Sequence, residues 1–212
     1  MSRRRRRVFA RRYPSAAAPL EARGLGAQRA RLLAPVSGRV LELGCGFGAN
    51  FPHYPETVTE LVAVEPEPRF RDLSREKADD LGLKAAIVDG TAEALPVESD
   101  SFDTVIATAV LCSVDSQQDA LAEIFRVLKP GGALVCFEHV GAHGDDPSLV
   151  ERAFDAALWS PLNGGCHLSR DTLGAIEAAG FTTEGLRREH FGFLPWPVSR
   201  KPHLVGTALK PL

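Results

Sequence analysis

A glycine-rich segment that directly follows a short apolar run restricts the fold of this 212-residue chain more than any other feature of its sequence. The apolar run 40–43 predicts a buried strand, and Gly44, Gly46 and Gly48 follow it at once. Glycine allows a tight turn and lets the backbone approach a ligand closely. Asn50 stands where a helix could begin, and amide donors at a helix N-terminus suit a carboxylate or a phosphate. We therefore expect a strand, a ligand-binding loop and a helix in this order.

The spacing of this loop supports two kinds of ligand. Gly44-x-Gly46-x-x-Ala49 satisfies the dinucleotide fingerprint, whose last glycine may be replaced by alanine, and so indicates an NAD(P)-dependent oxidoreductase. Glu42, on the strand just before the loop, indicates the second kind, because a carboxylate would repel a pyrophosphate but would attract a cationic ligand.

Strand-like and helix-like segments alternate from residue 40 to residue 140, which predicts a doubly wound α/β sheet with its ligand at the carboxyl ends of the strands. Glu65 lies 21 residues after Gly44, at the expected end of the second strand, where a carboxylate can accept hydrogen bonds from both hydroxyls of a ribose. The expected strands are 40–43, 60–65, 84–88, 101–111, 133–140, 183–190 and 203–209, and the expected helices are 17–33, 69–81, 116–128, 149–159 and one capped by Ser169.

Composition indicates a single globular domain, with 44% hydrophobic and 25% charged residues. No apolar run approaches the roughly 18 residues that span a membrane, and no secretory signal follows the first arginines, so we expect a cytoplasmic protein without a membrane span. The first twelve residues include seven arginines, and we expect residues 1–12 to be a flexible basic tail. Such a tail could contact nucleic acid non-specifically, although a run of arginines without aromatics is more often only a charged terminus.

The cysteines are widely separated in the sequence. They contain no Cys-x-x-Cys pair, so neither a zinc knuckle nor a disulfide framework is indicated, and no metal site is expected. Reduced and mostly buried thiols are the simpler interpretation. The four residues are Cys45, Cys112, Cys136 and Cys166.

The pattern Glu42-x-Gly44-x-Gly46-x-Gly48 resembles motif I of the class I S-adenosylmethionine (SAM) methyltransferases, and the block from Ser101 to the Leu-Lys-Pro-Gly-Gly segment at 128–132 is also similar to that family. The resemblance implies that the glycine loop wraps the methionine end of SAM. The segment Thr91–Pro96 resembles the adenine-binding loop, with Thr91 where the family has aspartate. The cofactor-binding residues implied together are Glu42, Gly44, Cys45, Gly46, Gly48, Glu65, Pro66, Thr91, Ala92, Glu93 and Thr108.

The same resemblance implies a Rossmann-like fold, that is, a doubly wound, mostly parallel seven-stranded sheet closed by an antiparallel C-terminal hairpin. We expect one domain, 13–212, with a SAM-binding core at 37–140 and an acceptor-side region with the last strands at 141–212. For the helical segment at about 13–36 we hypothesise a lid over SAM that excludes water. The implied activity is methyl transfer from SAM to a small-molecule acceptor. A non-catalytic SAM-binding regulatory protein and the oxidoreductase remain as alternatives.

A narrower resemblance concerns the acceptor. Gly-Ala-Asn-Phe at 48–51, Glu138-His139-Val140 and Cys166-His167-Leu168-Ser169-Arg170 resemble the branch that contains membrane-associated thiol S-methyltransferases, which makes a thiol one candidate acceptor. The animal members of that branch carry an apolar amino-terminal anchor, whereas this sequence has arginines there, so membrane attachment is not expected.

Methyl transfer from a sulfonium requires mainly that the nucleophile be held about 3 to 3.5 Å from the methyl carbon, and a base is needed only if the acceptor must lose a proton. His139, at the end of the fifth strand, is the first candidate for that base, although it could equally hydrogen-bond a loop, and His167 is the second. Glu138 is expected to be structural and Cys112 to pack beside the cofactor. Tyr13, Phe154 and Trp159 could form apolar walls for the acceptor or could belong to the core.

Overall fold

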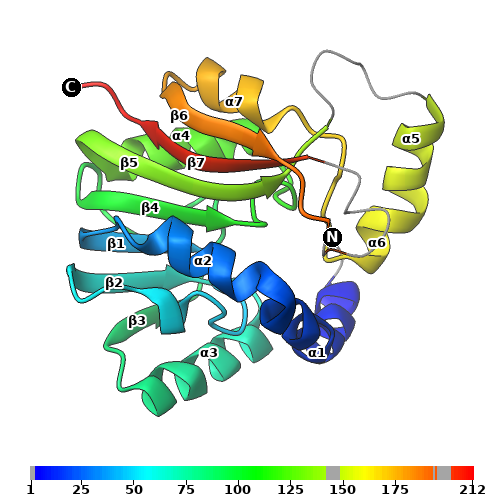
Figure 1. Ribbon diagram of the computed structural model, residues 1–212, viewed down its shortest axis with the longest axis horizontal. Helices are drawn as coiled ribbons and strands as arrows, with labels where there is room; N and C mark the ends of the chain where they lie inside the picture. The colour runs from blue at the N-terminus through cyan, green and yellow to red at the C-terminus, as the bar shows by residue number, and fades with distance from the viewer. Residues whose placement is uncertain (1–2, 142–148, 193, 195–201) are drawn as a thin grey trace.

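The computed structural model describes residues 3–141, 149–192, 194 and 202–212, and these residues form one α/β unit (Figure 1). Over the described residues the sheet has seven strands in the order β3-β2-β1-β4-β5-β7-β6. Strands β1 to β5 run parallel, whereas β7 is antiparallel to both β5 and β6. The strands are β1 Gly38–Leu43, β2 Val58–Val64, β3 Ala85–Val88, β4 Phe102–Thr108, β5 Leu128–His139, β6 Thr182–Glu189 and β7 His203–Leu209. The doubly wound sheet with an antiparallel C-terminal hairpin is confirmed.

Helices cover both faces of this sheet. Figure 1 shows α2 and α3 on one face and α4 and α7 on the other, while α1, α5 and α6 lie near the edge toward which β4 and β5 point. The helices are α1 Arg3–Leu20, α2 Gly26–Leu33, α3 Pro68–Leu81, α4 Gln117–Val127, α5 Leu149–Phe154, α6 Ser160–Leu162 and α7 Thr172–Ala178, with short π and 3-10 turns at η1 Glu21–Leu25, η2 Phe51–His53 and η3 Asp155–Trp159. The strand order changes direction between β1 and β4, and a ligand crevice is expected at such a switch point.

The parallel strands are apolar on both sides because each face is buried under helices. One layer packs Leu41, Val105 and Leu134 of the sheet against Leu121 of α4 and Ile176 of α7. The opposite layer packs Val40, Ile106 and Val135 against Leu33 of α2 and Ala78 of α3. Alternate residues of one strand therefore serve the two layers, which fixes the register of β1, β4 and β5.

The amino terminus differs from the expectation. Residues 3–12 belong to the helix α1, whereas the arginine run suggested a flexible basic tail. The rings of Phe9 and Tyr13 stack at 4.7 Å, and both contact Phe70 of α3 edge-on at 6.1 and 6.4 Å. Ala10 is fully buried. Packing on Phe70 stabilises the helix. Because Phe70 lies about 60 positions away in the chain, the composition of the first residues could not reveal this contact.

Three smaller boundaries also differ. Strand β4 ends at Thr108 rather than at residue 111, and β5 begins at Leu128, because Phe102 pairs with Leu128 before the register shifts. The residue that caps α7 is Asp171 rather than Ser169, since the Asp171 carboxylate accepts from the amide of Gly174 at 3.2 Å. Ser169 instead donates its hydroxyl to Asp155 at 2.9 Å.

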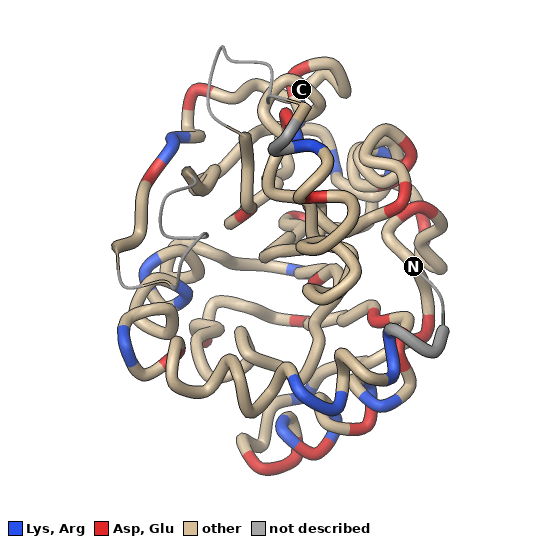
Figure 2. The backbone as a smooth tube through the Cα atoms, turned by 90° about the vertical axis from the view of Figure 1, so that its right-hand side faces the viewer, with Lys and Arg blue, Asp and Glu red and all other residues tan. Residues whose placement is uncertain are grey.

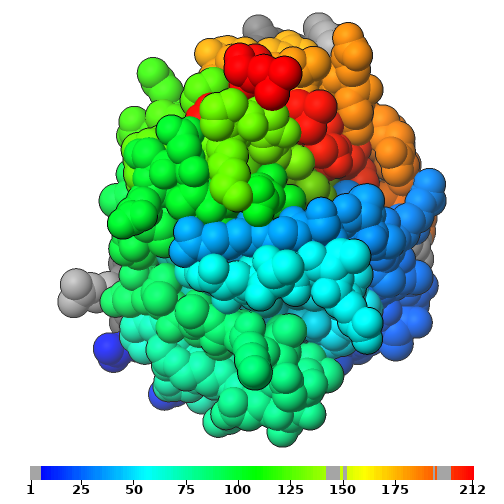
Figure 3. Space-filling model, turned by 90° about the vertical axis from the view of Figure 1, so that its left-hand side faces the viewer, coloured from blue at the N-terminus to red at the C-terminus, as the bar shows by residue number. Residues whose placement is uncertain are grey.

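Charged residues are interspersed on the outside of the molecule. Figure 2 shows Lys and Arg next to Asp and Glu along α3, and the basic positions of α1 lie at the same end of the molecule. Figure 3 shows the side opposite to that of Figure 2. There the C-terminal residues lie beside the first residues of β5, and the Gly131 amide donates to the Lys210 carbonyl at 3.0 Å. Among the described residues, none of the helices combines the length and the apolar character that a bilayer crossing requires.

Candidate active site

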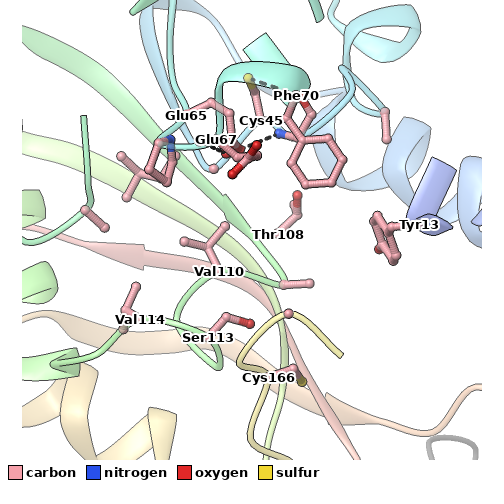
Figure 4. A pocket seen from close by; sticks show the side chains of 18 of the residues that line it. Tyr13, Cys45, Glu65, Glu67, Phe70, Thr108, Val110, Ser113, Val114 and Cys166 are labelled. Carbon is pink, nitrogen blue, oxygen red and sulfur yellow. Dashed lines mark hydrogen bonds between the residues drawn. The ribbon is translucent and has the colours of Figure 1, made fainter. Parts of the chain in front are cut away.

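A cavity of about 660 Å³ opens at the carboxyl ends of the parallel strands. Its walls come from the loops that follow β1, β2, β3 and β4, from the end of β5, from α1 and α2, and from residues 159–166. A volume of this size is usual for a pocket that takes a small molecule, and its place is the crevice that the strand order predicts. Figure 4 shows Glu65 at one end of the cavity and Cys166 at the other, with Thr108 and Val110 between them.

The glycine loop presents bare backbone to this cavity. Gly46 has a φ of +56°, and a Cβ on it would meet nothing closer than the Gly44 carbonyl at 4.0 Å, so the site requires glycine for its conformation. Gly44 lies against Val110, whose methyl carbon would be 2.8 Å from an added Cβ. Gly48 does not line the cavity; it faces the ring of Phe51 and is a packing position.

Glu65 organises the loop end of the cavity. Its side chain is 5% exposed, and its two carboxylate oxygens accept from the amides of Gly46 at 2.9 Å and Glu67 at 2.8 Å. Burial raises the pKa of Glu65, and the two amide bonds act against that rise. Each oxygen keeps a further lone pair toward the cavity, so the carboxylate can accept two ligand hydroxyls. Pro66 follows it along the wall.

Glu42 lies beneath the glycine loop in a network of polar side chains. Its carboxylate is 1% exposed and accepts from Asn50 Nδ2 at 2.9 Å and from the Tyr54 hydroxyl at 2.8 Å. Burial raises the pKa of Glu42 to about 7, against the lowering effect of these two hydrogen bonds and of Arg29. A cationic ligand group near Glu42 would favour its charged form.

Sequence reasoning missed Arg29, which belongs to α2 and lines the cavity. Its guanidinium donates to Asn50 Oδ1 at 2.7 Å and to Thr108 Oγ1 at 3.3 Å, and it pairs with Glu21 at 3.1 Å. Asn50 was expected only as the start of a helix, yet its side chain bridges Arg29 and Glu42. No local motif marks these partners, because they lie 8 to 79 residues apart in the chain.

The residues of the predicted adenine-binding loop also reach the cavity. Thr91, Ala92 and Glu93 line it together with Thr108, the last residue of β4. The Glu93 carboxylate accepts from the amide of Asp115 at 2.8 Å, which ties this loop to the turn after β4. Cys45 lines the same wall. All the expected cofactor-binding residues except Gly48 therefore surround one space.

Glu138 has the structural role that the sequence suggested. It is fully buried, and its carboxylate accepts from the amides of Val110 at 2.8 Å, Leu111 at 2.9 Å and Cys112 at 3.1 Å. Burial raises the pKa of Glu138, and the three amides oppose that rise. His139, the next residue, lines the cavity. The pKa of His139 is raised overall: burial lowers it, but the hydrogen bond with Cys112 and the charge of Glu138 outweigh burial.

Of the remaining candidates for the acceptor region, some line the cavity and others lie outside it. His167 does not line the cavity; its ring nitrogens lie 3.1 Å from the Asp155 carboxylate and 3.3 Å from the Ser160 hydroxyl, so it braces the loop that carries it. Tyr13 and Trp159 line the cavity, whereas Phe154 does not. Asp155, which the sequence did not single out, is buried and also accepts from the amide of Leu168 at 3.0 Å.

Comparison with known proteins gives consistent matches. A family model described as a methyltransferase domain matches residues 41–136. A thiol S-methyltransferase of Rattus norvegicus is 37% identical over 174 residues, which cover 81% of this chain and 70% of that protein. A thiol S-methyltransferase of Homo sapiens is 36% identical over 175 residues, with the same coverage of 81% and 70%.

Solved structures share the fold at low sequence identity. A SAM-dependent methyltransferase from Thermotoga maritima superposes with a TM-score of 0.67 at 20% identity and covers 97% of this chain and 99% of its own. A SAM-dependent methyltransferase from Aquifex aeolicus superposes with a TM-score of 0.57 at 18% identity and covers 81% of each chain.

The raised pKa of Glu42 has a consequence for stability. An acid whose pKa is higher in the folded than in the unfolded protein keeps its proton on folding between the two pKa values, so stability falls as pH rises through that window. For Glu42 the window runs from about 4.5 to about 7. Relative to Glu42→Gln, the wild type should lose about 2 kcal/mol of unfolding free energy between pH 5 and pH 7.

Urea unfolding of the wild type and of Glu42→Gln at several pH values measures the two free energies of unfolding. Subtracting one from the other at each pH removes the contribution of the other titrating groups. Asp72→Asn, at an exposed position on α3, is the matched control and should follow the wild type at every pH. Parallel stability curves for the wild type and Glu42→Gln would show that Glu42 titrates normally.

Proposed function

This chain belongs to the family of SAM-dependent methyltransferases that includes the mammalian thiol S-methyltransferases, and we propose that its acceptor is the sulfur atom of a small thiol. The chain is a SAM-dependent methyltransferase, so the oxidoreductase alternative is set aside. Bound SAM supplies a methyl group that its sulfonium makes electrophilic. The observation that carries the thiol proposal is the 37% identity to a thiol S-methyltransferase over 81% of this chain.

We propose that the end of the cavity around Glu65 takes the cofactor. The two free lone pairs of the Glu65 carboxylate suit the two hydroxyls of a ribose, and its bond to the Gly46 amide holds the glycine loop at the right distance. Glu42 suits a cofactor that carries positive charge, because its proton is only weakly held at pH 7. A carboxylate on the same ligand would find the guanidinium of Arg29 nearby.

The opposite end of the cavity suits an apolar acceptor. Phe137 and Trp159 line the cavity and pack in the same cluster as Cys166, and His139 and Cys166 supply polar atoms there. Walls of this kind hold the acceptor in line with the methyl group, which is the main requirement of the reaction. A thiol must lose its proton to become a good nucleophile. We propose His139 as the residue that promotes this loss.

We also propose that α1 closes the cavity. Phe9 and Tyr13 of α1 line the cavity and pack on Phe70, so the helix shields the reacting groups from water. The pair of Arg29 with Glu21 holds the segment between α1 and α2 in the same place. A cytoplasmic location stays a prediction from the sequence.

Replacing Glu65 by alanine should weaken SAM binding by about 1 to 3 kcal/mol, because charge-assisted hydrogen bonds of that size are lost. Isothermal titration calorimetry with SAM measures the effect. Glu60→Ala, at an exposed position earlier on β2, is the matched control and should bind as the wild type does. Equal affinity for SAM in Glu65→Ala would remove Glu65 from the cofactor site.

A screen with isotopically labelled SAM across thiols, phenols, amines and carboxylates should give methylated thiols as the main products. The apolar lining predicts a preference for thiols with an aromatic or alkyl body over charged ones such as glutathione, and mass spectrometry of the products locates the methyl group. Transfer to oxygen or nitrogen acceptors with none to sulfur would refute the thiol proposal and leave the methyltransferase assignment intact.

Removing residues 1–20, which contain α1, should weaken SAM binding several-fold and lower turnover, because the cavity loses Phe9 and Tyr13. The deletion stops at residue 20 so that Arg29 and the fully buried Leu33 stay in place. The double variant Arg11→Ala, Arg12→Ala changes only exposed positions of α1 and should behave as the wild type. A stable truncated protein with unaltered SAM affinity would argue against a closing role for α1.

A further inference from the structure

Three potential metal ligands meet at the acceptor end of the cavity. Cys112 follows β4, His139 ends β5, and Cys166 lies in the loop between α6 and α7. The Nδ1 atom of His139 lies 3.7 Å from the Cys112 sulfur and 3.4 Å from the Cys166 sulfur, and all three ligand atoms lie within 4.8 Å of one another. The sequence did not predict this cluster, because its members are 27 residues apart at each step and form no metal-binding motif.

These distances suit a tetrahedral metal centre. Zn–S bonds of about 2.3 Å and Zn–N bonds of about 2.0 Å place a sulfur and a nitrogen about 3.5 Å apart around one tetrahedral ion. The observed separations of 3.4 and 3.7 Å lie on either side of that value. We propose that Cys112, His139 and Cys166 bind a zinc ion whose fourth position faces the cavity.

The residues that line the cavity indicate that the fourth coordination position of the proposed ion is open to the cavity. His139 and Cys166 are lining residues, and Figure 4 shows Cys166 next to Ser113 at the end of the cavity away from Glu65. Cys112 lies behind them and is fully buried. Two cysteines, one histidine and one exchangeable position form a ligand set that catalytic zinc sites use, whereas structural sites fill all four positions with protein.

Burial also favours a neutral metal centre over free thiolates, because Cys112 is fully buried and Cys166 is only 6% exposed. Two thiolates and a neutral imidazole around a divalent zinc ion carry no net charge. A neutral centre can be buried at much lower cost than an isolated thiolate.

The backbone around the cluster is rigidly held, as a metal site requires. The Glu138 carboxylate accepts from the amide of Cys112 at 3.1 Å, and the amide of His167 donates to the Cys112 carbonyl at 2.8 Å. The second of these bonds joins the turn after β4 to the loop that carries Cys166. Asp155 fixes the same loop through the amide of Leu168 at 3.0 Å.

The proposed ion would activate the acceptor, and this part rests on the proposed function. An acceptor thiol that binds the fourth position would lose its proton to solvent and become a metal-bound thiolate, because a coordinated thiol is strongly acidified. His139 would then promote this loss as a ligand of the ion and not as a free base. The acceptor sulfur then forms a bond to the methyl carbon of SAM while the bond from that carbon to the sulfonium sulfur breaks. The electron pair stays on the donor, which becomes S-adenosylhomocysteine. The product is a neutral thioether, a weaker ligand that can leave.

Cobalt(II) titration of the metal-depleted full-length protein tests the site without any methyl transfer. With a phosphine reductant present, we expect one equivalent of cobalt to give thiolate-to-metal charge transfer and the ligand-field absorption of a tetrahedral ion. Cys112→Ala and Cys166→Ala should lose the charge-transfer absorption in large part. Cys136→Ala, at a fully buried thiol of β5 outside the cluster, is the matched control and should keep it.

Absence of charge transfer in the reduced wild type, or equal spectra in all four proteins, would overturn the site. So would a protein whose cobalt spectrum requires oxygen ligands only. Elemental analysis of the protein purified without chelator should show about one zinc per chain, and Cys166→Ala should lose it, whereas the SAM affinity of this variant should not change.

A second measurement separates the ion from its proposed role. Adding benzyl mercaptan to the cobalt form should shift its charge-transfer absorption, and benzyl alcohol should not. Cobalt binding without this shift would overturn thiol activation at the metal and leave the site standing. Thiol methylation by a chelator-treated protein at the full rate would overturn the metal proposal and leave the proposed function standing.

Discussion

The three hydrogen bonds that the buried Glu138 carboxylate accepts from the amides of residues 110–112 connect the two ends of the cavity. They fix the turn after β4. On one side of this turn, Val110 packs against Gly44 and so limits where the glycine loop can lie. On the other side, the turn holds Cys112 against His139 and Cys166. A single buried carboxylate at the end of β5 therefore links the glycine loop, through Val110, to the turn that carries Cys112.

Two further buried carboxylates act in the same manner at neighbouring strand ends. Glu42 in β1 gathers Asn50 and Tyr54, and Glu65 after β2 binds the amides of Gly46 and Glu67. Because the parallel strands end at one edge of the sheet, these groups meet around one space. Burial raises the pKa of both carboxyl groups, so a cationic cofactor in that space would favour their charged forms. At the other end of the cavity, the Cys112 and Cys166 thiols lie beside the His139 imidazole.

Features that depend on contiguous sequence could be predicted. The apolar run before three glycines identified β1 and its loop, and the spacing to Glu65 located the end of β2, because a parallel sheet repeats its strand and turn at regular intervals. Features that depend on contacts between distant segments could not be predicted. The order of α1 comes from Phe9 and Tyr13 on Phe70, and the position of Arg29 comes from Asn50 and Thr108. The cluster of Cys112, His139 and Cys166 likewise exists only once β4, β5 and the loop before α7 are assembled. Gly48 belongs to the same sequence motif but packs against Phe51, a neighbour that the motif alone does not reveal.

We propose that one cavity holds SAM at the Glu65 end and a thiol at the Cys166 end. A crystal structure with S-adenosylhomocysteine and an unreactive thioether product tests it most directly. We expect the ribose hydroxyls within hydrogen-bonding distance of the Glu65 carboxylate, and the sulfur of the nucleoside facing the thioether near Cys166 and His139. A nucleoside bound elsewhere, or one whose sulfur faces away from Cys166, would contradict the account.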